Sequence, residues 1–64
     1  MSMAPRVVTP SRRVNEYTVV IDEGARDGLS EGDSVMLSVD GSDHLRATVV
    51  DVAETEAVLE INTV

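Results

Sequence analysis

The chain contains no cysteine, no lysine, no tryptophan and no phenylalanine among its 64 residues, and Tyr17 is its only aromatic residue. Without cysteine, neither a disulfide nor a thiolate metal site can stabilise the fold. The core must therefore be built from Val, Leu, Ile, Ala and Met, which pack well between pleated strands. A chain this short buries only about 60% of the surface that it exposes when unfolded. Dimerisation is thus an expected source of additional stability.

Long apolar segments are also missing. No apolar run reaches the roughly 18 residues that a transmembrane helix needs. The stretch between Arg6 and Arg12 is too short and too interrupted to be the apolar centre of a signal peptide. These absences predict a soluble, cytoplasmic protein.

Negative charge dominates the composition. Twelve carboxylates stand against five arginines, which gives a formal net charge of −7 at pH 7. Together with the missing lysine and cysteine, this balance resembles the proteins of salt-loving archaea, in which hydrated carboxylates keep a protein soluble at high salt. The alternative is an acidic protein from a GC-rich mesophile, where arginine also replaces lysine.

The N-terminal residues differ from the rest of the chain. Residues 1–13 hold both prolines, three of the five arginines and no carboxylate. Pro5 and Pro10 exclude a helix and favour an extended path. We expect a basic N-terminal arm over 1–13, either mobile or with an edge strand at 6–8, followed by one small domain over 14–64.

From residue 14 onward, apolar residues alternate with polar ones at the period of a β-strand, and no segment shows a competing helical period. The alternation predicts four strands whose inward side chains are Tyr17, Val19 and Ile21; Val35, Leu37 and Val39; Leu45, Ala47 and Val49; and Ala57, Leu59 and Ile61. It slips by one residue where Val50 and Val52 flank Asp51. Such a slip predicts a β-bulge, which bends a strand where a barrel closes.

Two short polar segments connect these strands. The Asp-Gly pair in 40–43 is typical of a tight hairpin, and 53–56 suits a second one. The last three strands should therefore form a meander. Four strands, or five with one at 6–8, bury both faces most economically as a small all-β barrel of the SH3-like or OB-like kind. The alternative is a strongly curled antiparallel meander that dimerises through its apolar face.

The glycine-rich segment GARDGLSEGD, residues 24–33, invites a ligand-binding interpretation. A phosphate-binding loop would need Lys and Ser or Thr after the last glycine, where Asp33 stands. A calcium loop that began at Asp22 would have Asp27 at the position of its sharp-turn glycine. The spacing instead favours two consecutive turns between strands, with Leu29 pointing back into the core.

This segment carries a family resemblance. The string IDEGARDGLSEGDSVML, followed by RATVVDVAETEAVLEI, resembles small β-barrel modules in the bacterial cell-shape protein MreC and in some flagellar assembly proteins. The resemblance covers roughly residues 19–61. Because those modules mediate protein assembly and are not catalytic, the resemblance implies a barrel fold and an assembly role, without assigning functional residues.

The sequence offers little that catalysis could use. His44 is the only histidine and lies in a solvated turn beside Asp43, which predicts a surface residue rather than a general base. The carboxylates of the last hairpin alternate with core positions and should form a solvated face: Asp51, Glu54, Glu56 and Glu60. We therefore expect no catalytic, cofactor-binding or metal-binding residues, and no enzyme activity.

Binding surfaces remain as the candidates for function. Val20, Met36 and Val58 are apolar residues at otherwise outward-facing positions, and we predict that they form a contact surface for a protein partner or a second copy. The alternative class is nucleic-acid binding through four arginines: Arg6, Arg12, Arg13 and Arg46. The acidic domain and the absence of aromatic stacking platforms make this alternative the weaker one.

Overall fold

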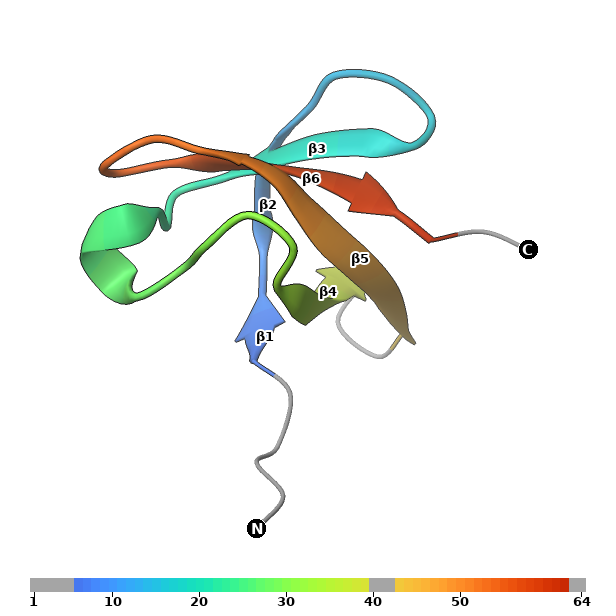
Figure 1. The fold of residues 1–64 in the computed structure, drawn as a ribbon. Helices are drawn as coiled ribbons and strands as arrows, with labels where there is room; N and C mark the ends of the chain where they lie inside the picture. Colours follow the sequence, from blue (N-terminus) through green and yellow to red (C-terminus); the bar gives the residue numbers. More distant parts are fainter. Residues whose placement is uncertain (1–5, 40–42, 63–64) are drawn as a thin grey trace, which may run out of the picture.

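In the computed structural model, which describes residues 6–39 and 43–62, six short strands and one turn of 3-10 helix make up the chain (Figure 1). In chain order, the elements are β1 (Val7–Val8), β2 (Pro10–Arg13), β3 (Thr18–Ile21), the 3-10 helix η1 (Ala25–Asp27), β4 (Ser34–Val39), β5 (Asp43–Val52) and β6 (Ala57–Ile61). The strands form one sheet in the order β1-β4-β5-β6-β3-β2, which curls into a half-barrel. The predicted all-β class is confirmed.

The middle of the sheet is the predicted meander. β4 pairs antiparallel with β5 and β5 with β6, and the pairs Val39–Asp43 and Val52–Ala57 stand next to the two connecting turns. The turn at 53–56 is a hairpin in which the Ala53 amide donates to the Glu56 carbonyl oxygen at 2.8 Å. Residues 40–42 of the other predicted hairpin lie outside the described residues. β3 then pairs antiparallel with β6 and extends the sheet.

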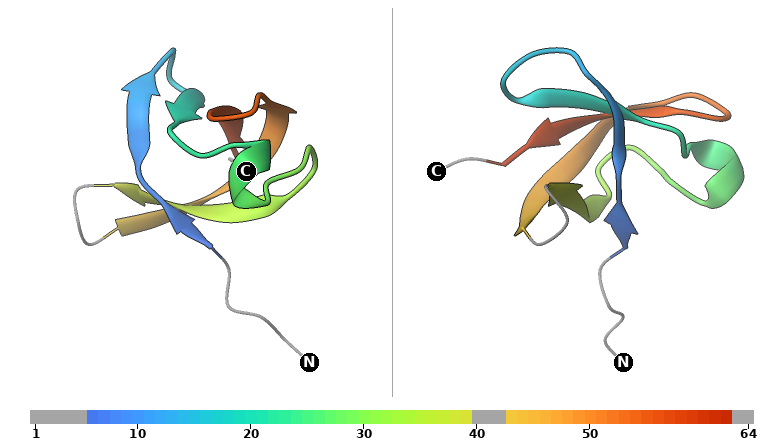
Figure 2. Two further views of the ribbon diagram at one scale, coloured as in Figure 1. Left: turned by 90° about the vertical axis from the view of Figure 1, so that its left-hand side faces the viewer. Right: turned by 180° about the vertical axis from the view of Figure 1, so that it is seen from behind.

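The N-terminal segment supplies the two outermost strands, which brings the strand number to six rather than four or five. β1 pairs parallel with β4, and β2 pairs antiparallel with β3. The sheet is therefore mixed. Because β1 and β2 are separated only by Thr9, one segment runs from one edge of the sheet to the other, as the blue ribbon of Figure 2 shows. The sheet thus includes residues 7–8, where the sequence allowed an edge strand, and residues 10–13, which the sequence assigned to a basic arm.

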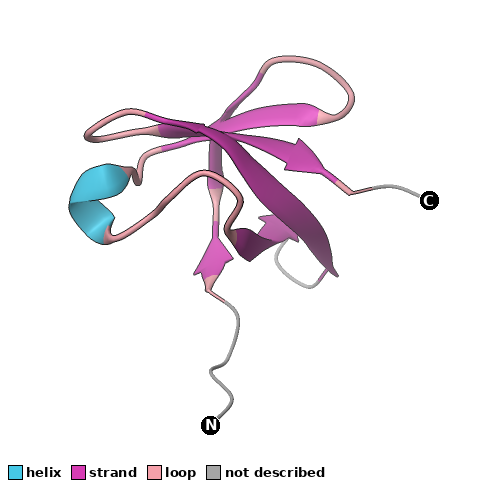
Figure 3. Ribbon diagram, in the orientation of Figure 1, coloured by secondary structure: helices cyan, strands magenta, loops and turns pink. Residues whose placement is uncertain are grey.

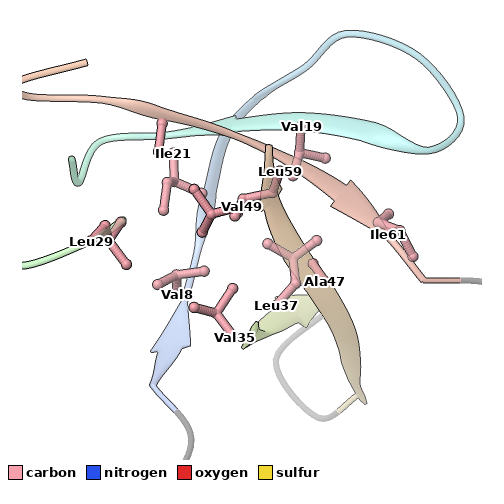
Figure 4. Packing of buried hydrophobic residues seen from close by; sticks show 11 residues of the cluster. Val8, Val19, Ile21, Leu29, Val35, Leu37, Ala47, Val49, Leu59 and Ile61 are labelled. Carbon is pink, nitrogen blue, oxygen red and sulfur yellow. The ribbon is translucent and has the colours of Figure 1, made fainter. Parts of the chain in front are cut away.

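The strands curl around one side of the sheet (Figure 3), and the core side chains lie inside this curl (Figure 4). Its members come from all strands but β2, with Leu29 added from a loop: Val8, Val19, Ile21, Leu29, Val35, Leu37, Ala47, Val49, Ala57, Leu59 and Ile61. Most of the side chains predicted to point inward are buried here. Val8 joins them because β1 places it beside Leu37.

Two inward predictions were wrong, and a third is not described. Leu45 lies opposite Leu37 but is 41% exposed, and Tyr17 is exposed as well. Leu45 lies in the half of β5 near the β4–β5 turn, beyond the part that β6 pairs with, and Tyr17 precedes β3, so strands do not flank them on both sides. The side chain of Val39 lies outside the described residues.

The predicted β-bulge is confirmed in β5. Val49 lies opposite Leu59, but the next pair joins Asp51 to Val58, so Val50 is the extra residue. The bulge keeps Val49 in the core and leaves Val50 exposed. It also returns Val52 to the core side, where its half-buried side chain packs against the cluster.

The segment 24–33 forms two turns, as predicted. Gly28 ends η1 with φ at +90°, and Gly32 has φ at +92°, which is the left-handed region that glycine adopts without a β-carbon clash. Between them, the Leu29 side chain is buried in the core. Leu29 therefore packs this bend against the core.

Carboxylates hold the two turns together. The Gly24 amide donates to Asp27 Oδ2 at 3.1 Å, and the Ser30 amide donates to Asp33 Oδ2 at 2.9 Å. Asp27 and Asp33 therefore have structural partners within the loop. Their hydrogen bonds explain part of the acidic character of this segment without any ligand.

Candidate interaction surface

The outer face of the sheet, opposite the core, is the main candidate for a functional surface. Within residues 6–39 and 43–62, no pocket opens, no polar side chain is buried, and no three His, Asp or Glu side chains come together in a group that could hold a metal ion. No helix in this part of the chain is both long and apolar enough to cross a membrane. His44 is exposed and lies opposite Ser38 on β4.

One row of side chains crosses four strands on the outer face. Residues directly opposite each other on paired strands point to the same face. Asp51 lies opposite Val58, Val58 opposite Val20, and Val20 opposite Arg12. We call these four residues the Asp51–Arg12 row. An acidic residue stands at its β5 end, two valines in its middle and a basic residue at its β2 end.

A polar row runs beside it. Ser34 lies opposite Thr48, Thr48 opposite Glu60, and Glu60 opposite Thr18. The Thr48 hydroxyl also donates to Asn62 Oδ1 at 3.1 Å. This polar row has the composition expected of a solvated sheet face.

Met36 lies on the far side of the polar row. It is opposite Arg46 on β5 and beside Val7 on β1. The structure therefore brings Val20 and Val58 together, as predicted, but separates both from Met36. The three residues do not form one continuous patch.

The exposed fraction of each side chain determines which of these residues a partner can contact. Val20 is only 5% exposed although it lies outside the core cluster, whereas Val58 and Met36 are half-buried. Two exposed valines near them were missed at the level of sequence: Val50 at the bulge, 45% exposed, and Val7 on β1, 54% exposed. The slip in alternation marked the position of Val50 in the sequence. No sequence signal marked Val7, since its neighbours are set by the pairing of β1 with β4.

The four predicted arginines do not converge. The Arg6 guanidinium pairs with Glu23 Oε1 at 3.0 Å and donates to the Asp27 carbonyl oxygen at 2.8 Å. Arg13 donates to the carbonyl oxygens of the turn after β2, at residues 15 and 16. Arg12 and Arg46 both belong to the outer face, but β6 and β3 lie between their strands. Two of the four are thus occupied within the chain, and the other two stand apart.

The carboxylates of the last hairpin form the solvated face that the sequence predicted. Their side chains are all exposed: Asp51, Glu54, Glu56 and Glu60. Two of them stand on the outer face, Asp51 at the end of one row and Glu60 inside the other.

Comparison of the chain with protein-family models, with curated proteins and with solved structures gave no match. The resemblance to MreC and flagellar modules therefore stays a prediction, and the function has to be argued from the surface itself.

Proposed function

We propose that this chain is a non-catalytic β-barrel module that binds a protein partner through the outer face of its sheet. The observation that carries the proposal is the apolar content of the Asp51–Arg12 row and of Val50 beside it. An outer sheet face that only meets water carries polar residues, as the neighbouring polar row does. Apolar side chains gathered on an outer face, here the exposed Val50 and the half-buried Val58, are typical of partner surfaces. The resemblance to assembly modules suggests the same class of function.

Val50 is the best residue for testing this proposal. Its side chain is exposed, and it is the unpaired residue of the bulge, so a substitution leaves the core and the strand register intact. Val14 offers a matched control because it is also exposed, at 55% against 45% for Val50, but lies in the turn between β2 and β3. Val50→Asp and Val14→Asp add the same charge at the two places.

The experiment is a pull-down of the tagged protein from a lysate of the organism that encodes it, at native salt, with and without nuclease. We expect stoichiometric protein partners that survive nuclease, that are retained by Val14→Asp and that are lost with Val50→Asp. Equal recovery by both variants would overturn the proposed surface.

Nucleic-acid binding is the alternative outcome of the same experiment. It predicts recovered nucleic acid, loss of all partners on digestion, and loss of binding in an Arg12→Gln/Arg46→Gln double variant. Arg12 and Arg46 are the two of the four candidate arginines whose guanidinium groups make no hydrogen bond within the described residues.

A further inference from the structure

The Asp51–Arg12 row has opposite charges at its two ends. Both side chains are exposed. Within the part of the chain that the structure describes, the one ion pair joins Arg6 to Glu23, and neither Asp51 nor Arg12 makes a side-chain hydrogen bond there. The two charges are therefore available to groups outside the chain.

The order of the row makes it complementary to itself. From β5 to β2 it reads acidic, valine, valine, basic. Consider a two-fold axis that runs parallel to the strands, just outside the outer face and over the line midway between β6 and β3. Rotation about this axis reverses the order of the row. A second copy placed on the outer face by that axis has its Arg12 over Asp51 of the first copy, and its Val20 over Val58. With strands about 4.8 Å apart, the two charges of one row are about 14 Å apart along the curled sheet, so two separate ion pairs flank an apolar centre.

The neighbouring polar row fits the same arrangement. Because the axis runs along the strands, each row faces the same row of the second copy. Glu60 on β6 then faces Thr18 on β3 of the other copy, where the hydroxyl can donate to the carboxylate. Like charges do not face each other in either row, although the chain as a whole carries a net charge of −7. Two sheets packed face to face with nearly aligned strands are a common arrangement.

We propose that the outer face binds a second copy of this chain, forming a two-fold symmetric dimer in which Arg12 of each copy pairs with Asp51 of the other. This inference rests on the proposed function and names the occupant of that surface. A homodimer interface of this kind is isologous, since one patch meets itself. It also supplies burial to a domain whose own core, among the described residues, contains no aromatic side chain.

A dimer interface would cover a considerable share of so small a molecule. A standard interface buries about 800 Å² on each partner, whereas the whole chain exposes 4468 Å². Since Val20 is largely covered already, the exposed apolar contact comes mainly from Val58 and Val50. The two ion pairs therefore decide the orientation of the dimer, and their removal should be easy to detect.

The test is a charge exchange measured by analytical ultracentrifugation between about 1 μM and 1 mM protein. The wild-type chain should show a concentration-dependent monomer–dimer equilibrium. Arg12→Asp and Asp51→Arg should each weaken it by about 100-fold, since each places like charges opposite each other. The double variant Arg12→Asp/Asp51→Arg restores opposite charges at both contacts and should recover most of the wild-type association.

Matched controls exclude effects of net charge. Arg26→Asp and Glu31→Arg change exposed residues of the segment 24–33, away from the outer face, by the same charge. The dissociation constant of the dimer should stay within about two-fold of the wild-type value in both control variants. Circular dichroism should show the same β signal for every variant, so that a loss of association is not a loss of fold.

Three results would overturn the inference: a wild-type chain that stays monomeric at 1 mM, a double variant as weak as the single ones, or controls that weaken the dimer equally. The failure of this inference is separable from that of the proposed function. A monomeric wild type whose protein partner in the pull-down is lost with Val50→Asp would refute the dimer and retain the partner-binding surface.

Discussion

Gly24 lies so close to the β5–β6 turn that a β-carbon on it would come within 2.7 Å of the backbone nitrogen of Glu56 and would also overlap the carbonyl oxygen of Ala53. Backbone hydrogen bonds hold the two segments together at this place. The Ala25 amide donates to Ala53 at 2.9 Å, and the Arg26 amide donates to Glu54 at 3.0 Å. The segment that first suggests a ligand-binding loop therefore docks η1 onto a hairpin.

The first prediction follows from this contact. Gly24→Ala should lower the free energy of unfolding by about 3 kcal/mol, because backbone atoms on both sides must move to admit a methyl group. Gly32→Ala is the control: no atom lies within 4 Å of its β-carbon position, and only its φ of +92° opposes the change. It should cost about 1 kcal/mol. Urea unfolding measures both, and equal losses would contradict the close approach.

Leu29 gives the second prediction. Among the core residues that the structure describes, it is the one that comes from a loop, so Leu29→Ala should cost about 2–5 kcal/mol and could unfold so small a domain. Leu45→Ala removes the same atoms from an exposed position and should cost well under 1 kcal/mol. Thermal unfolding of both variants provides the measurement. A Leu29→Ala protein as stable as Leu45→Ala would mean that the loop does not contribute to the core.

The bulge in β5 gives the third prediction, from two adjacent valines. Val49→Thr buries a hydroxyl group in the core and should cost about 1–3 kcal/mol. Val50→Thr places the same hydroxyl in water, keeps the β-branch, and should change stability by no more than about 0.5 kcal/mol. If the two variants lost the same free energy in urea, the register shift between Val49 and Asp51 would be wrong.

Salt provides the fourth prediction. Because the chain carries a net charge of −7 and repels itself, raising KCl from 0.05 M to 2 M should raise Tm by about 5 °C or more at fixed protein concentration. The variant Glu31→Gln/Glu54→Gln removes two exposed carboxylates and should show a smaller gain. A Tm that falls with salt in both proteins would refute self-repulsion and the salt-adapted interpretation of the composition.

Much of the fold could be predicted from local pattern. Alternation located β4, β5 and β6, the slip after Val49 located the bulge, and the single leucine between two glycine turns identified Leu29 as a core residue. Each of these is a property of a few consecutive residues. The period of two determines which face a side chain takes as soon as a strand forms.

The N-terminal strands could not be predicted in this way. β1 has two residues, Val7 and Val8, which is too short to show any period. Its parallel pairing with β4 joins segments that are far apart in the sequence, so no local pattern encodes it. β2 consists of a proline, a serine and two arginines, and its place at an edge reflects available backbone groups rather than side-chain pattern.

The sequence predicted which side chains lie on the outer face, but not which of them lie next to each other. Alternation assigned Val20, Met36 and Val58 to the outside, and that face assignment agrees with the structure. Which outside residues touch each other depends on the register between strands, and the register puts Val58 next to Val20 while a polar row separates both from Met36. Burial of Val20 is likewise a result of its neighbours.

The segment from β1 to β2 covers both edges of the sheet that the other four strands form. The Arg6 carbonyl oxygen accepts from the Met36 amide at 2.8 Å beside one edge, and the Ser11 hydroxyl donates to the Val20 carbonyl oxygen at 3.1 Å at the other. When this segment detaches, the backbone N–H and C=O groups at both edges lose their partners at the same time. Such unpaired strand edges can pair with strands of other molecules. A protease that removes the residues before Val14 would therefore expose β4 at one edge of the sheet and β3 at the other, and each exposed edge could pair with a strand of another molecule.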